Sequence, residues 1–169
     1  IYVMNPDGTG QTRLTNNGAN DSYPSWGGRV VVNGKIAFTS GRTGNWDIFS
    51  MNADGTDVVQ LTSGGGRQNS PTWSPDGNRI AFVSDPSGSD LEIYVMNADG
   101  TSQTPLTTNT KDDEAPAWSP DGRKIAFQSQ RDGDWDIYVM NSDGTGQTIL
   151  TENSYWDSGP RWSPDGGKI

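Results

Sequence analysis

A unit of about 44 residues recurs four times along the 169-residue chain, and this internal repeat limits the possible folds more than any other feature. The copies carry the same short motifs in one order: Ile-Tyr-Val-Met-Asn, Asp-Gly-Thr, Leu-Thr, Pro-x-Trp, Ser-Pro-Asp-Gly and Ile-Ala-Phe. Successive tryptophans of the Pro-x-Trp motif are 47, 45 and 44 residues apart, at Trp26, Trp73, Trp118 and Trp162. The chain must therefore adopt a fold in which one unit packs against copies of itself.

Each unit is predicted to form four short strands, which run through Pro-x-Trp, Ile-Ala-Phe, Ile-Tyr-Val-Met and the Leu-Thr region. Pro-Asp-Gly suits the tight turns between them, because proline presets φ and glycine accepts the left-handed conformation. Asn33-Gly34 is predicted to make the corresponding turn in the divergent copy. Ile-Tyr-Val-Met is apolar at consecutive positions, so both faces of that strand must be covered. The pattern predicts an all-β fold, a β-propeller built of four-stranded antiparallel blades.

The repeats divide the chain into one propeller region over residues 1–169. We expect a partial blade at 1–17, blades at 22–64, 68–109 and 113–153, and a partial blade at 157–169. An open sheet edge exposes unpaired backbone groups, which native proteins usually cover. We therefore expect a segment of a larger propeller, or a chain whose blades are completed by another copy. A self-contained four-bladed ring is the alternative.

Composition excludes several classes of function. The chain has no cysteine and no histidine, so it holds no disulfide, thiolate metal site or Ser-His-Asp triad of its own. Its net charge of −9 opposes binding to nucleic acid or to anionic lipid, and no apolar run is long enough for membrane insertion. Almost every acidic residue belongs to a repeated turn, whereas a catalytic site is normally unique. We therefore predict that the chain is not an enzyme.

The repeated motifs resemble the TolB-type, WD40-like bacterial propeller repeat (PD40), whose units read Trp-Ser-Pro-Asp-Gly, Ile-Ala-Phe, Asp-Ile-Tyr-Val-Met-Asn-x-Asp-Gly and Leu-Thr. The match extends over the whole chain. The resemblance implies an extracytoplasmic binding scaffold, secreted or periplasmic, whose propeller face and central funnel meet partner proteins. It implies no catalytic activity, although related propellers also cap serine peptidases.

An acidic position stands five residues before three of the four tryptophans, at Asp21, Asp113 and Asp157, with Gln68 in the remaining copy. In a propeller these side chains would surround one opening of the channel. A ring of carboxylates there could hold Ca²⁺ through oxygen ligands, the one cofactor we consider. The alternative is that each aspartate caps its own loop before the strand begins.

Two further sets of acids allow similar alternatives. The Asn-x-Asp-Gly-Thr segments resemble the start of a calcium loop but lack its final glutamate, so tight hairpin turns are favoured. Carboxylates also precede the third strand, with arginines upstream in two copies; these residues are Asp47, Glu92, Asp136, Arg42 and Arg131. They could form a charged rim for a partner peptide, or they could fix the loop by hydrogen bonds.

Loop aromatics are the remaining candidates. Trp46 and Trp135 occupy the same position in two copies, and Trp156 stands just before Asp157. They could contact a peptide or stack on a sugar, or pack against the neighbouring blade. We predict a non-catalytic propeller for protein interaction or assembly, whose partner is a protein or another copy of the chain. The alternatives are a surface-layer or filament protein built head to tail, an accessory domain of a serine hydrolase, and a carbohydrate-binding module.

Overall fold

The computed structural model describes residues 1–27 and 34–169, which contain fourteen strands and no helix. No helix in those two ranges could therefore cross a membrane. The repeat predicted antiparallel strands throughout, and every strand pairing in the described residues is antiparallel. Asn33 of the predicted Asn33-Gly34 turn lies outside the described residues.

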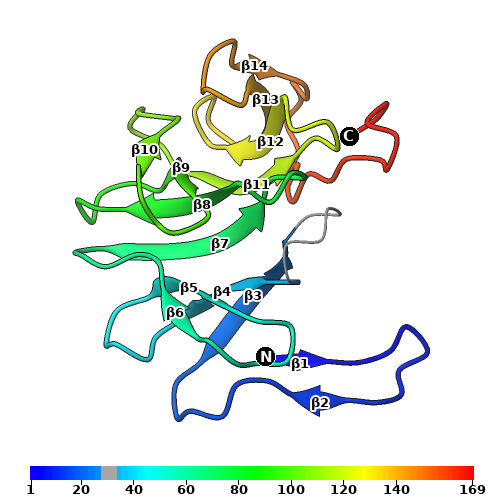
Figure 1. The fold of residues 1–169 in the computed structure, drawn as a ribbon. Helices are drawn as coiled ribbons and strands as arrows, with labels where there is room; N and C mark the ends of the chain where they lie inside the picture. Colours follow the sequence, from blue (N-terminus) through cyan, green and yellow to red (C-terminus); the bar gives the residue numbers. More distant parts are fainter. Residues whose placement is uncertain (28–33) are drawn as a thin grey trace.

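Three four-stranded sheets follow one another along the chain, as Figure 1 shows. The first blade consists of β3 (Asp21–Trp26), β4 (Ile36–Ser40), β5 (Asp47–Met51) and β6 (Val59–Gln60). The second consists of β7 (Arg67–Trp73), β8 (Arg79–Asp85), β9 (Glu92–Asn97) and β10 (Thr104–Pro105). The third consists of β11 (Asp113–Trp118), β12 (Lys124–Ser129), β13 (Asp136–Asn141) and β14 (Thr148–Ile149). A two-stranded sheet of β1 (Tyr2–Val3) and β2 (Thr12–Arg13) precedes them.

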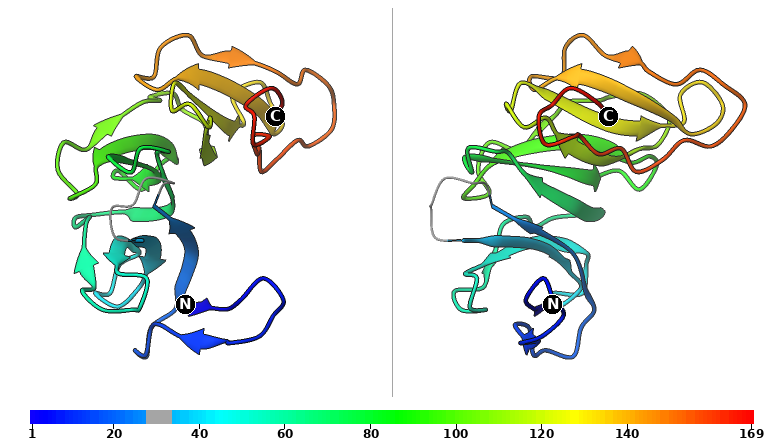
Figure 2. Two further views of the ribbon diagram at one scale, coloured as in Figure 1. Left: turned by 45° about the vertical axis from the view of Figure 1, so that its right-hand side comes forward. Right: turned by 90° about the vertical axis from the view of Figure 1, so that its right-hand side faces the viewer.

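The blades stack face to face in chain order (Figure 2). β7 packs against β3 and β4 of the first blade, and β11 packs against β7 and β8 of the second. We call the contact between two neighbouring blades a seam: the first seam joins the first and second blades, and the second seam joins the second and third. This stacking of repeated sheets is the propeller arrangement that the covered faces predicted.

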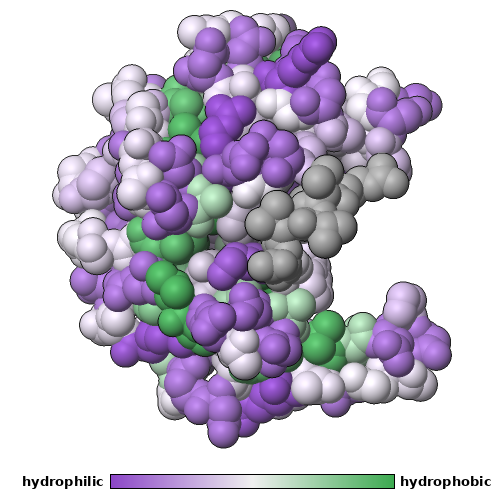
Figure 3. Space-filling model, viewed as in Figure 1, coloured by the Kyte–Doolittle hydropathy of each residue, from purple (hydrophilic) through white to green (hydrophobic). Residues whose placement is uncertain are grey.

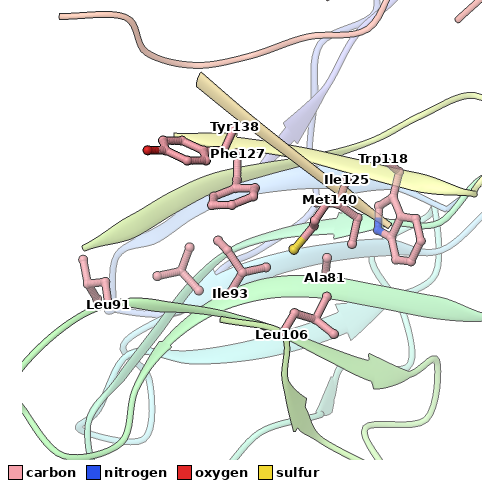
Figure 4. Packing of buried hydrophobic residues seen from close by; sticks show 10 residues of the cluster. Ala81, Leu91, Ile93, Leu106, Trp118, Ile125, Phe127, Tyr138 and Met140 are labelled. Carbon is pink, nitrogen blue, oxygen red and sulfur yellow. The ribbon is translucent and has the colours of Figure 1, made fainter. Parts of the chain in front are cut away.

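Hydrophobic residues fill each seam. In the second seam, Ile93 and Leu106 of the second blade meet Phe127 and Met140 of the third (Figure 4). Phe127 is fully buried, which is worth about 1.5–3 kcal/mol relative to an exposed side chain. Figure 3 shows that the viewed surface is largely hydrophilic, with apolar residues in narrow strips. A chain with only 30% hydrophobic residues can thus form a core, because its buried hydrophobic side chains gather in clusters between neighbouring sheets.

Polar groups fix the alignment of neighbouring blades. The indole Nε1 of Trp118 donates a hydrogen bond to the carbonyl of Thr72 in the preceding blade, at 3.2 Å. Trp162 repeats this bond to the carbonyl of Ala117, at 3.0 Å. In these two copies the tryptophan of the Pro-x-Trp motif thus joins its segment to the preceding inner strand, whereas Trp73 Nε1 has no partner among the described residues.

The Asp-Gly-Thr segments form tight turns closed by their own side chains. In the turn at Asp99, Oδ1 accepts hydrogen bonds from the backbone N of Thr101 at 3.0 Å and from its hydroxyl at 2.6 Å. These bonds hold the pKa of Asp99 below its usual value, chiefly through the threonine hydroxyl. The turn hypothesis therefore accounts for these carboxylates without any bound ion.

Candidate functional site

The innermost strands of the three blades share one backbone irregularity. The register of each strand shifts by a β-bulge, and one non-glycine residue in each bulge has a positive φ of about 50°; these residues are Tyr23, Ser70 and Ala115. A proline follows each of them, so the backbone there has no N–H to give to the ladder. Non-glycine residues seldom adopt this conformation, and such strain is typical of functional sites.

These bulges line a groove of about 530 Å³ along the inner strands. Its wall includes the bulge residues and their prolines, with Ser25, Thr72, Arg161 and Trp162. Arg161 is exposed and donates its only side-chain hydrogen bond in the described residues to the carbonyl of Pro160, at 2.9 Å. The groove thus offers hydroxyls, aromatic rings and a guanidinium, and its described lining contains no carboxylate.

The aspartates predicted to ring the channel are each held by their own loop. Each accepts a hydrogen bond from the side-chain amide of an asparagine four residues earlier, at 2.6–2.8 Å; the pairs are Asn17–Asp21, Asn109–Asp113 and Asn153–Asp157. Within residues 1–27 and 34–169, no three acidic side chains gather in a way that could hold a metal ion. At all three positions the aspartate is thus held by an asparagine side chain of its own loop, and the backbone N–H two residues after each asparagine donates to that asparagine.

The two arginines predicted to form a charged rim pair with these aspartates. Arg42 Nη2 lies 3.0 Å from Asp21 Oδ1, and Arg131 Nη2 lies 2.8 Å from Asp113 Oδ2. Each guanidinium also stacks on two rings of its own blade: Arg131 lies 4.6 Å from the ring centroid of Tyr138 and 5.4 Å from that of Phe127. Both arginines fix the loop between the second and third strands to the inner strand.

The acids before the third strands face the next blade. In the first seam Asp47 meets Gln68, whose Nε2, when it faces the carboxylate, donates to Asp47 Oδ1 at 2.8 Å. In the second seam the equivalent residues are Glu92 and Asp113, so two carboxylates meet where the first seam has a carboxylate and an amide. Both are buried, and Glu92 Oε1 and Asp113 Oδ1 have no hydrogen-bond partner among the described residues.

Burial raises the pKa of Glu92 to about 7, and the neighbouring charge of Asp113 contributes to this rise. The folded protein therefore binds a proton at Glu92 between about pH 4.5 and pH 7, where an unfolded glutamate is largely ionised. Because the folded state holds more protons in that range, the free energy of unfolding must fall as the pH rises through it.

Glu92→Gln is expected to raise the free energy of unfolding by about 1 kcal/mol at pH 8, because its amide can donate to the unpartnered Asp113 Oδ1. At pH 5 the two proteins should differ little, since Glu92 is then protonated. Urea unfolding at both pH values measures this, with the exposed Glu152→Gln as the control. If Glu92→Gln changed the free energy of unfolding equally at the two pH values, Glu92 would not be the group that binds a proton in the folded protein.

The predicted loop tryptophans differ in exposure. Trp156 is 79% exposed and Trp46 is 37% exposed, whereas Trp135 is half-buried. The backbone carbonyl of Trp46 accepts a hydrogen bond from the N–H of Gln68 in β7, and that of Trp135 accepts one from the N–H of Asp157 in the segment after β14. These loops therefore join neighbouring blades through the backbone, which leaves the indole of Trp46 available at the surface.

The repeated four-stranded blades agree with the comparison with known families. The model of the PD40 family, described as the TolB beta propeller domain, matches residues 1–84 and 65–169. The chain belongs to the PD40 family. A search of the curated proteins found no match.

Solved structures similar to this PD40 chain include two TolB proteins. TolB from Acinetobacter baumannii is 24% identical with a TM-score of 0.84, and a putative TolB from Agrobacterium tumefaciens is 30% identical with a TM-score of 0.79. The match covers 98% of this chain in both cases, but only 40% and 62% of those proteins. An oligogalacturonate lyase from Vibrio parahaemolyticus shares the fold at 15% identity, with a TM-score of 0.70 and coverage of 97% of this chain and 50% of the lyase.

Sequence reasoning missed several polar residues in the first seam of the PD40 blades. Asn20, Thr39, Arg67 and Asn69 line a pocket there, together with the predicted Trp46. A signal was nevertheless present, because these positions carry different residues in the first three repeats while the framework motifs recur. At positions that vary among otherwise similar repeats, each blade presents different side chains on its surface.

Proposed function

We propose that this chain is part of a non-catalytic, extracytoplasmic propeller that holds a segment of a partner protein in the groove along the inner strands. Membership of the PD40 family supports an interaction scaffold. The observation that carries the proposal is the groove itself, whose walls combine strained, proline-containing bulges with an exposed tyrosine and an exposed arginine.

The groove chemistry suits a peptide. Tyrosine and arginine are the side chains that most often dominate binding energy at protein interfaces, and Tyr23 is 60% exposed at one end of the groove. Arg161 lies in the segment after the third blade, so the two side chains come from opposite ends of the described propeller segment. A segment that contacts both must cross all three inner strands.

Peptides selected from a displayed random library on the immobilised chain should depend on these two side chains. Most selected peptides are expected to bind about tenfold more weakly to Tyr23→Ala and to Arg161→Ala, a loss of about 1.4 kcal/mol for each residue. Val59→Ala is the matched control, because Val59 is 48% exposed on the outermost strand. Peptides equally weakened by all three variants, or by none, would place the binding surface elsewhere.

A further inference from the structure

A second pocket, of about 420 Å³, lies in the first seam. We call it the seam pocket. Its aromatic side chains are Tyr23 of β3 and Trp46 of the loop before β5, and its polar side chains are Asn20, Ser22, Thr39, Arg67 and Asn69. Both blades contribute, since Arg67 and Asn69 belong to β7 and the others precede it. Pockets of this size commonly hold small ligands.

The polar side chains of the seam pocket are available for hydrogen bonds to a ligand. None of the five makes a side-chain hydrogen bond to the rest of the described chain. Thr39 is the clearest case, because it is only 1% exposed and its Oγ1 has no partner. A buried hydroxyl without a partner costs about 1–3 kcal/mol, a cost that a bound ligand would remove.

The other blades show what a closed version of this pocket looks like. In the second blade Val83 and Leu91 replace Thr39 and Trp46, and both are buried in the apolar cluster of the second seam. In the third blade Gln128 replaces Thr39, where it donates to Glu114 at 3.2 Å and accepts from the backbone N of Gly159 at 2.9 Å. The corresponding positions are thus filled by apolar contact or internal hydrogen bonds, whereas in the first seam they remain unpaired.

The charge around the pocket favours a neutral ligand. Arg67 is the one cation among the described residues that line the pocket, and it lies opposite Asp85 in the β7–β8 register. The charge of Arg67 also acts on the half-buried Glu114: burial raises the pKa of that carboxyl, and Arg67 opposes the rise. With its charge offset in this way, and with a net charge of −9 on the chain, Arg67 serves as a hydrogen-bond donor more than as an anion site.

We propose that the seam pocket binds one ring of a neutral saccharide. Trp46 and Tyr23 supply aromatic faces for the C–H surface of the ring, and the amides, hydroxyls and guanidinium supply both donors and acceptors for its hydroxyl groups. A ligand of this kind satisfies Thr39, which an apolar ligand cannot. The site is independent of the peptide groove in every residue except Tyr23, which lines both.

Titration with neutral oligosaccharides, namely cellotetraose, xylotetraose, mannotetraose and chitotetraose, tests the proposal through tryptophan fluorescence and amide chemical shifts. At least one should bind saturably and shift the backbone amides of Arg67 and Asn69. Trp46→Ala and the nearly isosteric Thr39→Val should each weaken it about tenfold, because each removes a contact of about 1.4 kcal/mol. Trp135→Ala, at the same loop position in the third blade, should leave the affinity unchanged.

Four outcomes would overturn the proposal. The first is that no neutral oligosaccharide binds at a concentration of about 10 mM, which is higher than the dissociation constants of ordinary ligand pockets. The second is that binding survives both Trp46→Ala and Thr39→Val. The third is that tetragalacturonate binds more tightly than every neutral sugar, which would assign the pocket to an anion. The fourth is that an acidic peptide competes for the same amides with higher affinity, which would assign it to a protein partner. Thermal unfolding of each variant separates loss of binding from loss of fold.

Discussion

Arg131→Met is expected to lower the free energy of unfolding by about 3 kcal/mol, because it leaves the fully buried carboxylate of Asp113 without its cation. Arg131 also donates to Ser129 Oγ at 2.9 Å and to Gln147 Oε1 at 2.6 Å, and it stacks on two aromatic rings. Removing it therefore frees the loop after β12 from the inner strand. Urea unfolding at pH 7 measures the loss.

Arg123→Met is the matched control for this experiment. Arg123 pairs with Asp121 at 4.0 Å, but both side chains are largely exposed, so no measurable change is expected. The double variant Arg131→Met with Asp113→Asn should recover part of the lost stability, because it removes the buried charge together with its partner. If the double variant is no more stable than Arg131→Met alone, the uncompensated charge is not the cause.

Gly100→Ala is expected to lower the free energy of unfolding by about 3 kcal/mol, because it forces the second blade away from the first. Gly100 has a φ of +87°, and a Cβ atom there would lie 2.5 Å from the carbonyl oxygen of Leu61 in the first blade. The side chain of Gln103 donates to the same oxygen at 3.4 Å, so one carbonyl organises this edge of the first seam. The expected cost combines the strain of an L-residue at positive φ with a backbone clash that no rotamer relieves.

Gly77→Ala separates these two contributions. Gly77 has a similar φ of +72°, but a Cβ atom there would have no neighbour within 4 Å, so only the conformational cost of about 1 kcal/mol is expected. The difference in midpoint between the two variants in urea unfolding measures the clash. Equal losses from Gly100→Ala and Gly77→Ala would show that the seam relaxes around the added methyl group.

The repeated part of this structure was predictable from sequence, because motifs such as Ile-Ala-Phe and Asp-Gly-Thr report the same local environment several times. The asparagines that bond to Asp21, Asp113 and Asp157 also left a signal in the sequence, since each stands four residues before its aspartate. The seams were not. Glu92 and Asp113 are 21 residues apart in different blades, and nothing local indicates that their carboxyl groups meet.

The seam pocket illustrates the same limit. Thr39 on its own is an ordinary strand residue, and only the packing of β4 beside β7 shows that its hydroxyl is buried without a partner. The sequence predicted Trp46 as a candidate but could not tell it from Trp135. The structure separates them, because the pocket beside Trp46 is open while the corresponding Gln128 in the third blade is bonded to its neighbours.

The seams also determine how the molecule would respond to mechanical load. Each blade is a complete set of consecutive strands, and among the described strands the packing contacts between blades join neighbours in chain order. A force applied along the stacking direction would therefore act on one seam after another. Each seam has its own tryptophan, its own close glycine contact, and either an acid–amide or an acid–acid pair. The second seam, in which Glu92 meets Asp113, would become the weaker one in alkaline solution. The order in which blades detach would therefore depend on proton concentration.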